Sequence, residues 1–232
     1  MNQPVSRASV HAFYAEAIRG GLNTAENLQA ATSERFNTLL ESVGNGTPRT
    51  ALDLGYGAGT YTIALARAGF RVVAVDQIPS ESLLQRIDGA SDWAHRIETR
   101  ECLAENFAVD EDFGFIVAKD VLHYLARRDV ESLLTSAVTY ARGANYHYLE
   151  VFTGITRTSA DGRPLRIEGE ADYSPDSFQR AVERIYDGWD LTLLWSEHAE
   201  QDSRTGRNCF EATRATVIAA NRSAGSETGR TP

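Results

Sequence analysis

The stretch that decides the fold is residues 51–60, which read ALDLGYGAGT. Its first four residues have the largely apolar pattern of a buried strand, and Gly55, Gly57 and Gly59 follow within five positions. Residues 60–68 then have a helical pattern, which stops at Gly69. A glycine-rich turn between a strand and a helix lets the backbone approach a ligand closely, although the same glycines also suit a tight turn without a ligand.

Outward from this segment, strand patterns alternate with helix patterns. The chain begins with two predicted helices, at residues 9–19 and 25–43, and further strands are predicted at 71–75, 96–100, 113–118 and 146–152. A helix capped by Asp129 ends before Gly143, another opens at Ser174-Pro175, and strands at 191–197 and 210–220 close the chain. We therefore predict a doubly wound α/β fold: a mostly parallel seven-stranded sheet with a C-terminal antiparallel hairpin and an N-terminal helical cap.

The length of 232 residues suits a single globular unit. Within it we expect a helical cap at 1–45 and a ligand-binding domain at 46–220. The first ten residues and the tail at 221–232 are polar and aperiodic, so both are expected to be frayed or disordered.

Charge and composition exclude several classes of function. The formal net charge is −9 and no run of Lys or Arg is present, which argues against a nucleic-acid substrate. No apolar stretch reaches the ~20 residues of a membrane helix, and the N-terminus lacks a secretory signal, so we expect a cytoplasmic protein without a membrane partner. The two cysteines and five histidines have no metal-binding spacing, so no metal is expected. A small molecule therefore remains as the expected substrate, and a homodimer is possible but not decided by the sequence.

The glycine turn indicates which ligand it would hold. The dinucleotide fingerprint needs glycine or alanine where this chain has Thr60, and Asp53 would lie near a pyrophosphate and repel it. A nucleoside that carries an ammonium group and no phosphate avoids this repulsion, and S-adenosylmethionine (SAM) is such a ligand. A nicotinamide-dependent oxidoreductase is disfavoured for the same reasons.

Asp76 closes the second predicted strand, RVVAVD at residues 71–76. A carboxylate at this position, about 20 residues after the glycine turn, accepts hydrogen bonds from the hydroxyls of a ribose. The alternative is a cap on the helix that follows near Ser80. We favour ribose binding because the spacing fits it.

With these residues in place, the segment from about 50 to 220 resembles the class I SAM-dependent methyltransferases. The matching motifs are DLGYGAG at 53–59, VVAVD at 72–76, FGFIVAKDVLHYL at 113–125 and YLEVF at 148–152, with the closing hairpin. The resemblance implies that SAM is bound by ten residues: Asp53, Gly55, Tyr56, Gly57, Gly59, Asp76, Gln77, Leu103, Ala104 and Lys119. One departure is Cys102-Leu103, where the family often has an acidic residue followed by a small one, so adenine recognition would use backbone groups or Glu105.

The resemblance also implies that the segment after the fourth strand lies beside the transferred methyl group. His123 is a candidate general base because an unperturbed imidazole titrates near neutral pH, although it also fits plain packing at a helix start. Asp120 is a second candidate and equally suits a helix cap. Glu150 and Tyr173 complete the set of candidate catalytic residues.

The acceptor is expected to be enclosed by the N-terminal helices and by a polar insert at 152–173, which we predict to be a long loop or lid. We predict a SAM-dependent methyltransferase that acts on a small polar molecule. Two alternatives keep SAM as the ligand. One is a cyclase or lyase that converts SAM itself to azetidine-2-carboxylate and methylthioadenosine, and the other is a SAM-binding protein without catalysis.

Overall fold

The computed structural model describes residues 4–19, 31–44, 47, 49–87, 89, 92–159, 161–202 and 205–221. The α-helices are α1 (Arg7–Arg19), α2 (Glu34–Glu41), α3 (Thr60–Arg67), α4 (Glu81–Ile87), α5 (Arg127–Tyr140) and α6 (Pro175–Ile185). The strands are β1 (Thr50–Leu54), β2 (Arg71–Asp76), β3 (Ile97–Glu101), β4 (Phe115–Lys119), β5 (Asn145–Thr158), β6 (Pro164–Leu165), β7 (Asp190–Gln201) and β8 (Asn208–Asn221). Short 3-10 helices lie at Ala94–Arg96, Ala104–Asn106 and Leu122–Tyr124.

The strands form one mixed sheet in the order β3-β2-β1-β4-β5-β8-β7, and the two-residue β6 pairs with β5. The first five strands of this path are parallel, while β8 runs antiparallel to both β5 and β7. This confirms the predicted fold class, a mostly parallel sheet closed by an antiparallel hairpin. The strand order reverses between β1 and β4, and in open α/β sheets ligands bind outside the carboxyl ends of strands at such a point.

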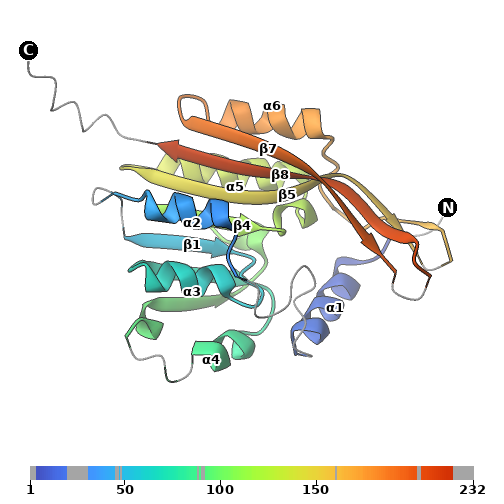
Figure 1. Cartoon of the computed structure of the whole chain (residues 1–232), viewed down its shortest axis with the longest axis horizontal. Coiled ribbons are helices and arrows are strands. Elements are labelled where there is room, and N and C mark those ends of the chain that lie inside the picture. The colour runs from blue at the N-terminus through green and yellow to red at the C-terminus, as the bar shows by residue number, and fades with distance from the viewer. Residues whose placement is uncertain are drawn as a thin grey trace, which may run out of the picture.

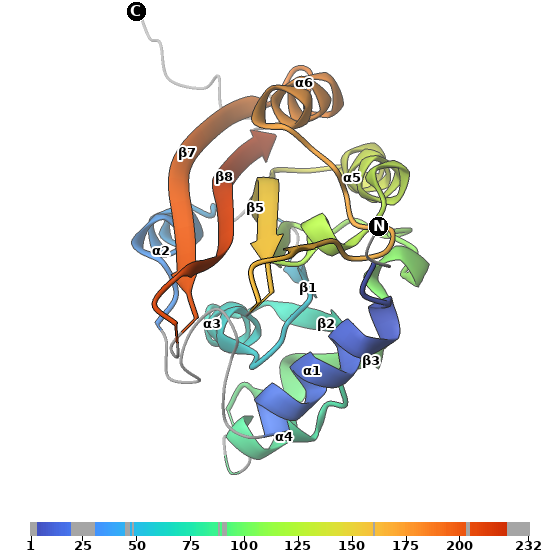
Figure 2. The same ribbon diagram turned by 90° about the vertical axis from the view of Figure 1, so that its right-hand side faces the viewer.

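Helices cover both faces of the sheet (Figure 1). On one face α2 and α3 pack their apolar residues on β1, β2, β4 and β5, in a cluster that includes Phe36, Leu65 and Tyr148. On the other face α5 and α6 pack against the alternate residues of the same strands, with Leu134 and Val182 buried. Figure 2 shows α1 apart from these layers, across the end of the sheet. The two helices of the predicted N-terminal cap lie in different places. Helix α1 lies over the carboxyl ends of the strands, whereas α2 belongs to one of the helical layers that cover the sheet.

The predicted loop at 152–173 is wrong over its first part. Residues 152–158 continue β5, which runs on past the end of β4 at Lys119 and pairs with β8 as far as Arg157. The pairing shifts register between Thr153 and Thr156, so β5 bends there. The sequence at 152–158 does not show the apolar pattern of a buried strand. Beyond the end of β4 the strand no longer lies in the middle of a sheet that helices cover, so polar residues are tolerated there. The bent strands β5, β7 and β8 project beyond the rest of the sheet (Figure 1).

Smaller corrections concern the ends of elements. Helix α5 begins at Arg127 after Ala126, so Asp129 lies in its first turn and does not cap it. Val5 forms a bridge to Ile167, and α1 begins at Arg7, so part of the first ten residues is ordered. Asn221 ends β8. The predicted helix at 25–43 is confirmed as α2 and is wrong at residues 31–33, which are not helical and end in the N-cap Ser33; residues 25–30, like the tail at 222–232, lie outside the described part.

Candidate functional site

A pocket of about 900 Å³ opens at the carboxyl ends of β1, β2 and β4, with α1 along one side. It brings together eleven of the fourteen residues that the sequence singled out: Asp53, Gly55, Tyr56, Gly57, Asp76, Gln77, Leu103, Ala104, Lys119, Asp120 and His123. Gly59, Glu150 and Tyr173 do not line it. The site is therefore where the strand order reverses, as the fold requires.

The glycine turn has the conformation that only glycine adopts easily. Gly55 has φ of +70°, and a Cβ added there would lie 2.6 Å from Cβ of Val121 in the segment after β4. Both the positive φ and the close approach require glycine at this position. Gly59 has φ of +78° and precedes α3, where it packs against Leu83, so its role in the structure is to let the helix start.

Asp76 ties the end of β2 to the glycine turn. Its Oδ2 accepts a hydrogen bond from the backbone N–H of Gly57 at 2.9 Å, and its Oδ1 accepts one from Ile78 at 3.0 Å. Burial raises the pKa of Asp76, and these two backbone bonds oppose the rise. Each carboxylate oxygen has a second lone pair, so Asp76 can still accept from a ligand hydroxyl.

Asp53 is a buried carboxylate below the turn, with 2% of its surface exposed. Burial raises its pKa from 3.8 to about 7; the hydroxyl of Thr62, which donates to Oδ2 at 2.6 Å, opposes the rise, and the charge of Asp76 adds to it. No cation among the described residues forms an ion pair with Asp53 or Asp76, whereas Arg7, Lys119 and Arg157, which also line the pocket, each have a carboxylate partner. This end of the pocket is therefore negative and suits a ligand with a positive charge and no phosphate.

The residues present fit SAM on these observations. Asp53 and Asp76 line the pocket where they would meet a cationic amino acid and a ribose, and Leu103 and Ala104 line it where they would supply an apolar wall for the base. Glu105, the acidic residue near this wall, forms an ion pair with Arg7 of α1. His11 Nε2 lies 3.1 Å from the carbonyl oxygen of Gln77, so α1 contacts the cofactor end of the pocket twice.

Asp120 follows β4 and has a strained backbone, with φ of +54°. Its backbone N–H donates to the carbonyl of Glu150 at 2.9 Å, and its Oδ2 accepts from Nζ of Lys119 at 2.7 Å. Oδ1 is buried and has no hydrogen-bond partner among the described residues. In this turn, at the pocket wall, one carboxylate oxygen of Asp120 is held by Lys119 and the other has no described partner.

His123 lines the pocket and is 1% exposed. Burial lowers its pKa from 6.5 to about 3, so the imidazole is neutral at physiological pH, and its Nδ1 has no hydrogen-bond partner in the described part of the chain. This burial includes ring packing against Tyr124 at 4.1 Å and Phe152 at 5.2 Å between centroids. A neutral, weakly basic imidazole suits hydrogen bonding better than proton abstraction.

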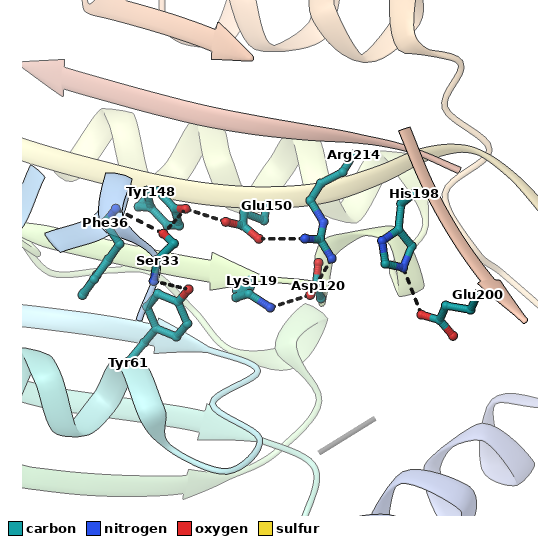
Figure 3. Close-up of polar contacts among 10 residues, drawn as sticks. All are labelled: Ser33, Phe36, Tyr61, Lys119, Asp120, Tyr148, Glu150, His198, Glu200 and Arg214. Atoms are coloured by element: carbon teal, nitrogen blue, oxygen red, sulfur yellow. Dashed lines mark hydrogen bonds and ion pairs between the residues drawn. The ribbon is translucent and has the colours of Figure 1, made fainter. Parts of the chain in front are cut away.

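Glu150 and Tyr173 lie behind the pocket and not in it. Glu150 accepts a hydrogen bond from Tyr148, and its Oε2 lies 3.8 Å from Arg214, whose other terminal nitrogen lies 3.7 Å from Asp120 (Figure 3). The carboxylate of Glu150 is therefore linked to the carboxylate of Asp120 through Arg214. Tyr173 is buried against α5 and α6, with its hydroxyl 3.3 Å from the carbonyl of Arg127, so the structure does not bring it to the site.

Several pocket residues escaped the sequence analysis: Arg7 and Phe13 of α1, Phe152 and Arg157 of β5, and Phe210 of β8. Arg157 and Phe210 are paired residues of β5 and β8, 53 positions apart in the chain. No local pattern marks such a pair, because it is created by strand pairing. The sequence offered one indication, the polarity of the segment 152–173, which contains Arg157 and suggested a polar acceptor.

The described residues form neither a metal-binding cluster nor a helix that could span a membrane. Within the described ranges, no group of three or more His, Cys, Asp or Glu side chains is placed to hold a metal ion. Among the same residues no helix is both long and apolar enough to cross a membrane.

Residues 51–142 match the family described as "Methyltransferase domain". No curated protein matches the chain, whereas many solved structures share its fold. One is the 1,6-didemethyltoxoflavin-N1-methyltransferase of Burkholderia thailandensis, 16% identical, with a TM-score of 0.62 over 96% of this chain and 93% of that one. TehB from Haemophilus influenzae is 18% identical, with a TM-score of 0.57 over 91% and 67%. The N-methyltransferase NodS from Bradyrhizobium japonicum is 16% identical, with a TM-score of 0.54 over 90% and 98%.

The sheet order and the pocket at its switch point define the fold of the class I SAM-dependent methyltransferases. The segment 51–142, which carries the glycine turn, Asp76 and Asp120, is a methyltransferase domain, and SAM is its cofactor. The chain accordingly contains a SAM-dependent methyltransferase domain.

Proposed function

We propose that this enzyme transfers the methyl group of SAM to a nitrogen, oxygen or carbon atom of a small molecule that enters the pocket beside α1. The observation that carries the proposal is that the pocket continues past the cofactor residues, from Lys119 and Asp120 to His123, Phe152 and Phe210. This second part is a place for another substrate. The toxoflavin-precursor enzyme and NodS, similar in fold, are both named as methyltransferases, and the first is named for a small acceptor.

The roles of the chain follow from the site. SAM supplies a methyl group on a positively charged sulfur, which is already a strong electrophile. Asp53 would hold the ammonium group of the cofactor, and Asp76 the ribose hydroxyls, since both line the pocket and neither forms an ion pair with a described cation. Alignment of an acceptor atom with the methyl group is then the main task of the protein.

Proton removal from the acceptor falls to Asp120 in this proposal. Lys119 holds its Oδ2, and its Oδ1 has no partner among the described residues. An electron pair of the acceptor forms the new bond to the methyl carbon, the carbon–sulfur electrons return to sulfur, and the released proton goes to Oδ1. His123, whose pKa burial lowers to about 3, would orient the acceptor by a hydrogen bond.

The domain division, a homodimer and a cytoplasmic location also belong to the proposal. We propose that the cap at 1–45 and the domain at 46–220 act as one unit, because Arg7 of α1 bonds to Glu105 and to the carbonyl of Tyr124. A homodimer stays a prediction. So does a cytoplasmic location.

Mass spectrometry of SAM incubated with the purified protein, without an acceptor, tests the reaction class. We expect SAM to bind and stay intact. Accumulation of methylthioadenosine above a no-enzyme control, with azetidine-2-carboxylate, would instead establish the cyclase or lyase. If SAM binds but no compound of a small-molecule library leads to its conversion to S-adenosylhomocysteine (SAH), the result would establish a SAM-binding protein without catalysis.

A further inference from the structure

The part of the pocket beyond the cofactor end has a chemistry of its own. We call it the aromatic chamber and define it by Tyr124, His123, Phe152, Arg157 and Phe210, all of which line the pocket. It is built from the segment after β4 and from the projecting parts of β5 and β8. Its ligand preference follows from its ring geometry, its charge balance and its hydrogen-bonding capacity.

Four rings of the chamber contact one another in series. The centroids of Tyr124 and His123 are 4.1 Å apart, those of His123 and Phe152 5.2 Å, and those of Phe152 and Phe210 5.1 Å. The last two pairs meet edge to face, at 73° and 75°, so successive rings present faces and edges in different directions. Such a wall favours a ligand with a flat π system, which gains ring contacts that an alicyclic ring of equal size does not.

The five residues of the chamber carry no unbalanced charge. Arg157 forms an ion pair with Glu170 at 2.6 Å, and burial keeps His123 neutral. Glu200, which also lines the pocket, lies 3.0 Å from Nε2 of His198 (Figure 3), and the two form an ion pair only when that imidazole is protonated. The chamber thus differs from the cofactor end, where Asp53 and Asp76 form no ion pair with a cation among the described residues, and its five residues favour neither an anion nor a cation.

The chamber still has specific hydrogen-bonding capacity. The Arg157 guanidinium lies over the Phe210 ring at 5.1 Å and the Tyr124 ring at 6.0 Å, and its Nη2 has no hydrogen-bond partner among the described residues. A guanidinium nitrogen can only donate, so it needs an oxygen or an unprotonated ring nitrogen. Nδ1 of the neutral His123 imidazole is equally without a described partner, and in the tautomer with the proton on Nε2 it accepts from an N–H or O–H group.

From these observations we propose that the methyl acceptor is a flat, uncharged ring system that carries a carbonyl-type oxygen beside an N–H or O–H group. Its plane lies against Phe152 and Phe210, its oxygen accepts from Arg157, and its N–H or O–H points to His123. Arg157 and Phe210 then determine specificity, and Asp120 lies next in line toward the methyl group. This inference rests on the proposed function, because it assumes that the chamber holds the second substrate.

Three probes of similar size test the proposal on SAH-loaded protein near neutral pH: phthalimide, hexahydrophthalimide and phthalate. Phthalimide is flat and uncharged, with an N–H between two carbonyls; hexahydrophthalimide keeps the imide but loses the flat ring; phthalate keeps the ring but is anionic. Binding is followed by titration in NMR spectra of the protein. We expect phthalimide to bind about fivefold more tightly than hexahydrophthalimide, the size of a good aromatic contact, and phthalate to bind more weakly still.

Variants assign the contacts. Phe210→Leu should remove the preference for phthalimide over hexahydrophthalimide, whereas Tyr140→Leu, which alters a partly exposed ring on α5 outside the pocket, should keep it. Arg157→Met should weaken phthalimide binding about tenfold, the effect of a hydrogen bond to a charged donor. SAH affinity and melting temperature report whether each variant still folds.

The outcomes separate this inference from the proposed function. Failure of the unaltered protein to bind SAH contradicts the proposed function. Normal SAH binding with equal affinity for the flat and saturated imides, or with tighter binding of phthalate, overturns the inference and leaves the proposed function intact. A preference for phthalimide that Phe210→Leu does not change also overturns it, because the ring would then bind elsewhere.

Discussion

The carboxylate of Asp76 accepts a hydrogen bond from the backbone N–H of Gly57, over 2.9 Å. The acidic end of β2 thereby holds the middle of the glycine turn that follows β1, and the two halves of the cofactor site are built as one piece. Asp76 both shapes the turn and faces the ligand, so its removal affects binding in two ways.

Replacement of this carboxylate should weaken cofactor binding. We expect Asp76→Ala to raise the Kd for SAM about tenfold or more, the effect of losing charged hydrogen bonds worth ~1.5–3 kcal/mol. Isothermal titration calorimetry measures this directly. Glu101→Ala is the matched control, since Glu101 ends the neighbouring strand and accepts from Ser80 but does not line the pocket. Equal Kd values for Asp76→Ala and the unaltered protein would remove Asp76 from the site.

The turn should not tolerate a side chain at Gly55. Gly55→Ala places a Cβ 2.6 Å from Cβ of Val121 and also strains a positive φ. Gly188→Ala strains a similar φ, +80°, where nothing lies within 4 Å of the added atom. Strain alone costs ~1–2 kcal/mol, so urea unfolding should show a larger loss of stability for Gly55→Ala than for Gly188→Ala. SAM binding should suffer only in Gly55→Ala. Similar losses in both variants would mean that the turn moves aside easily.

Cofactor binding should depend on pH through Asp53. Its pKa is raised to about 7, so in the free protein its charge disappears as the pH falls below neutrality. SAM keeps its ammonium group charged across this range, and the attraction to Asp53 is lost on acidification. The Kd should therefore rise about tenfold between pH 7 and pH 5.5. In Asp53→Asn the Kd should be higher and nearly constant over the same interval. An identical slope in both proteins would assign the pH dependence to another group.

His123 should stay neutral throughout the physiological range. Burial lowers its pKa to about 3, so its imidazole NMR resonances should not shift between pH 8 and pH 5. In the urea-unfolded chain the same ring should titrate near its ordinary value of 6.5. His123→Gln, recorded in parallel, assigns the resonance. A midpoint above pH 6 in the folded protein would restore His123 as the general base and displace Asp120 from that role.

The sequence by itself determined the fold class and most of the cofactor end. The turn from Gly55 to Gly59, the strand that ends at Asp76 and the alternation around them are local patterns, and a βαβ unit leaves little choice of handedness or position. The carboxyl ends of parallel strands must meet at one edge of the sheet. The convergence of Asp53, Asp76 and Asp120 at that edge can therefore be predicted without knowing any other contact.

Only the tertiary structure decided the acceptor end and the state of its groups. Arg157 and Phe210 become neighbours because β5 runs on past β4 and pairs with β8, and strand pairing between distant segments leaves no local signal. Burial between Tyr124 and Phe152 turns His123 from an ordinary base into a neutral hydrogen-bonding group. Burial likewise raises the pKa of Asp53 to about 7. A pKa depends on what surrounds a side chain in space, and that is set by packing and not by the order of residues.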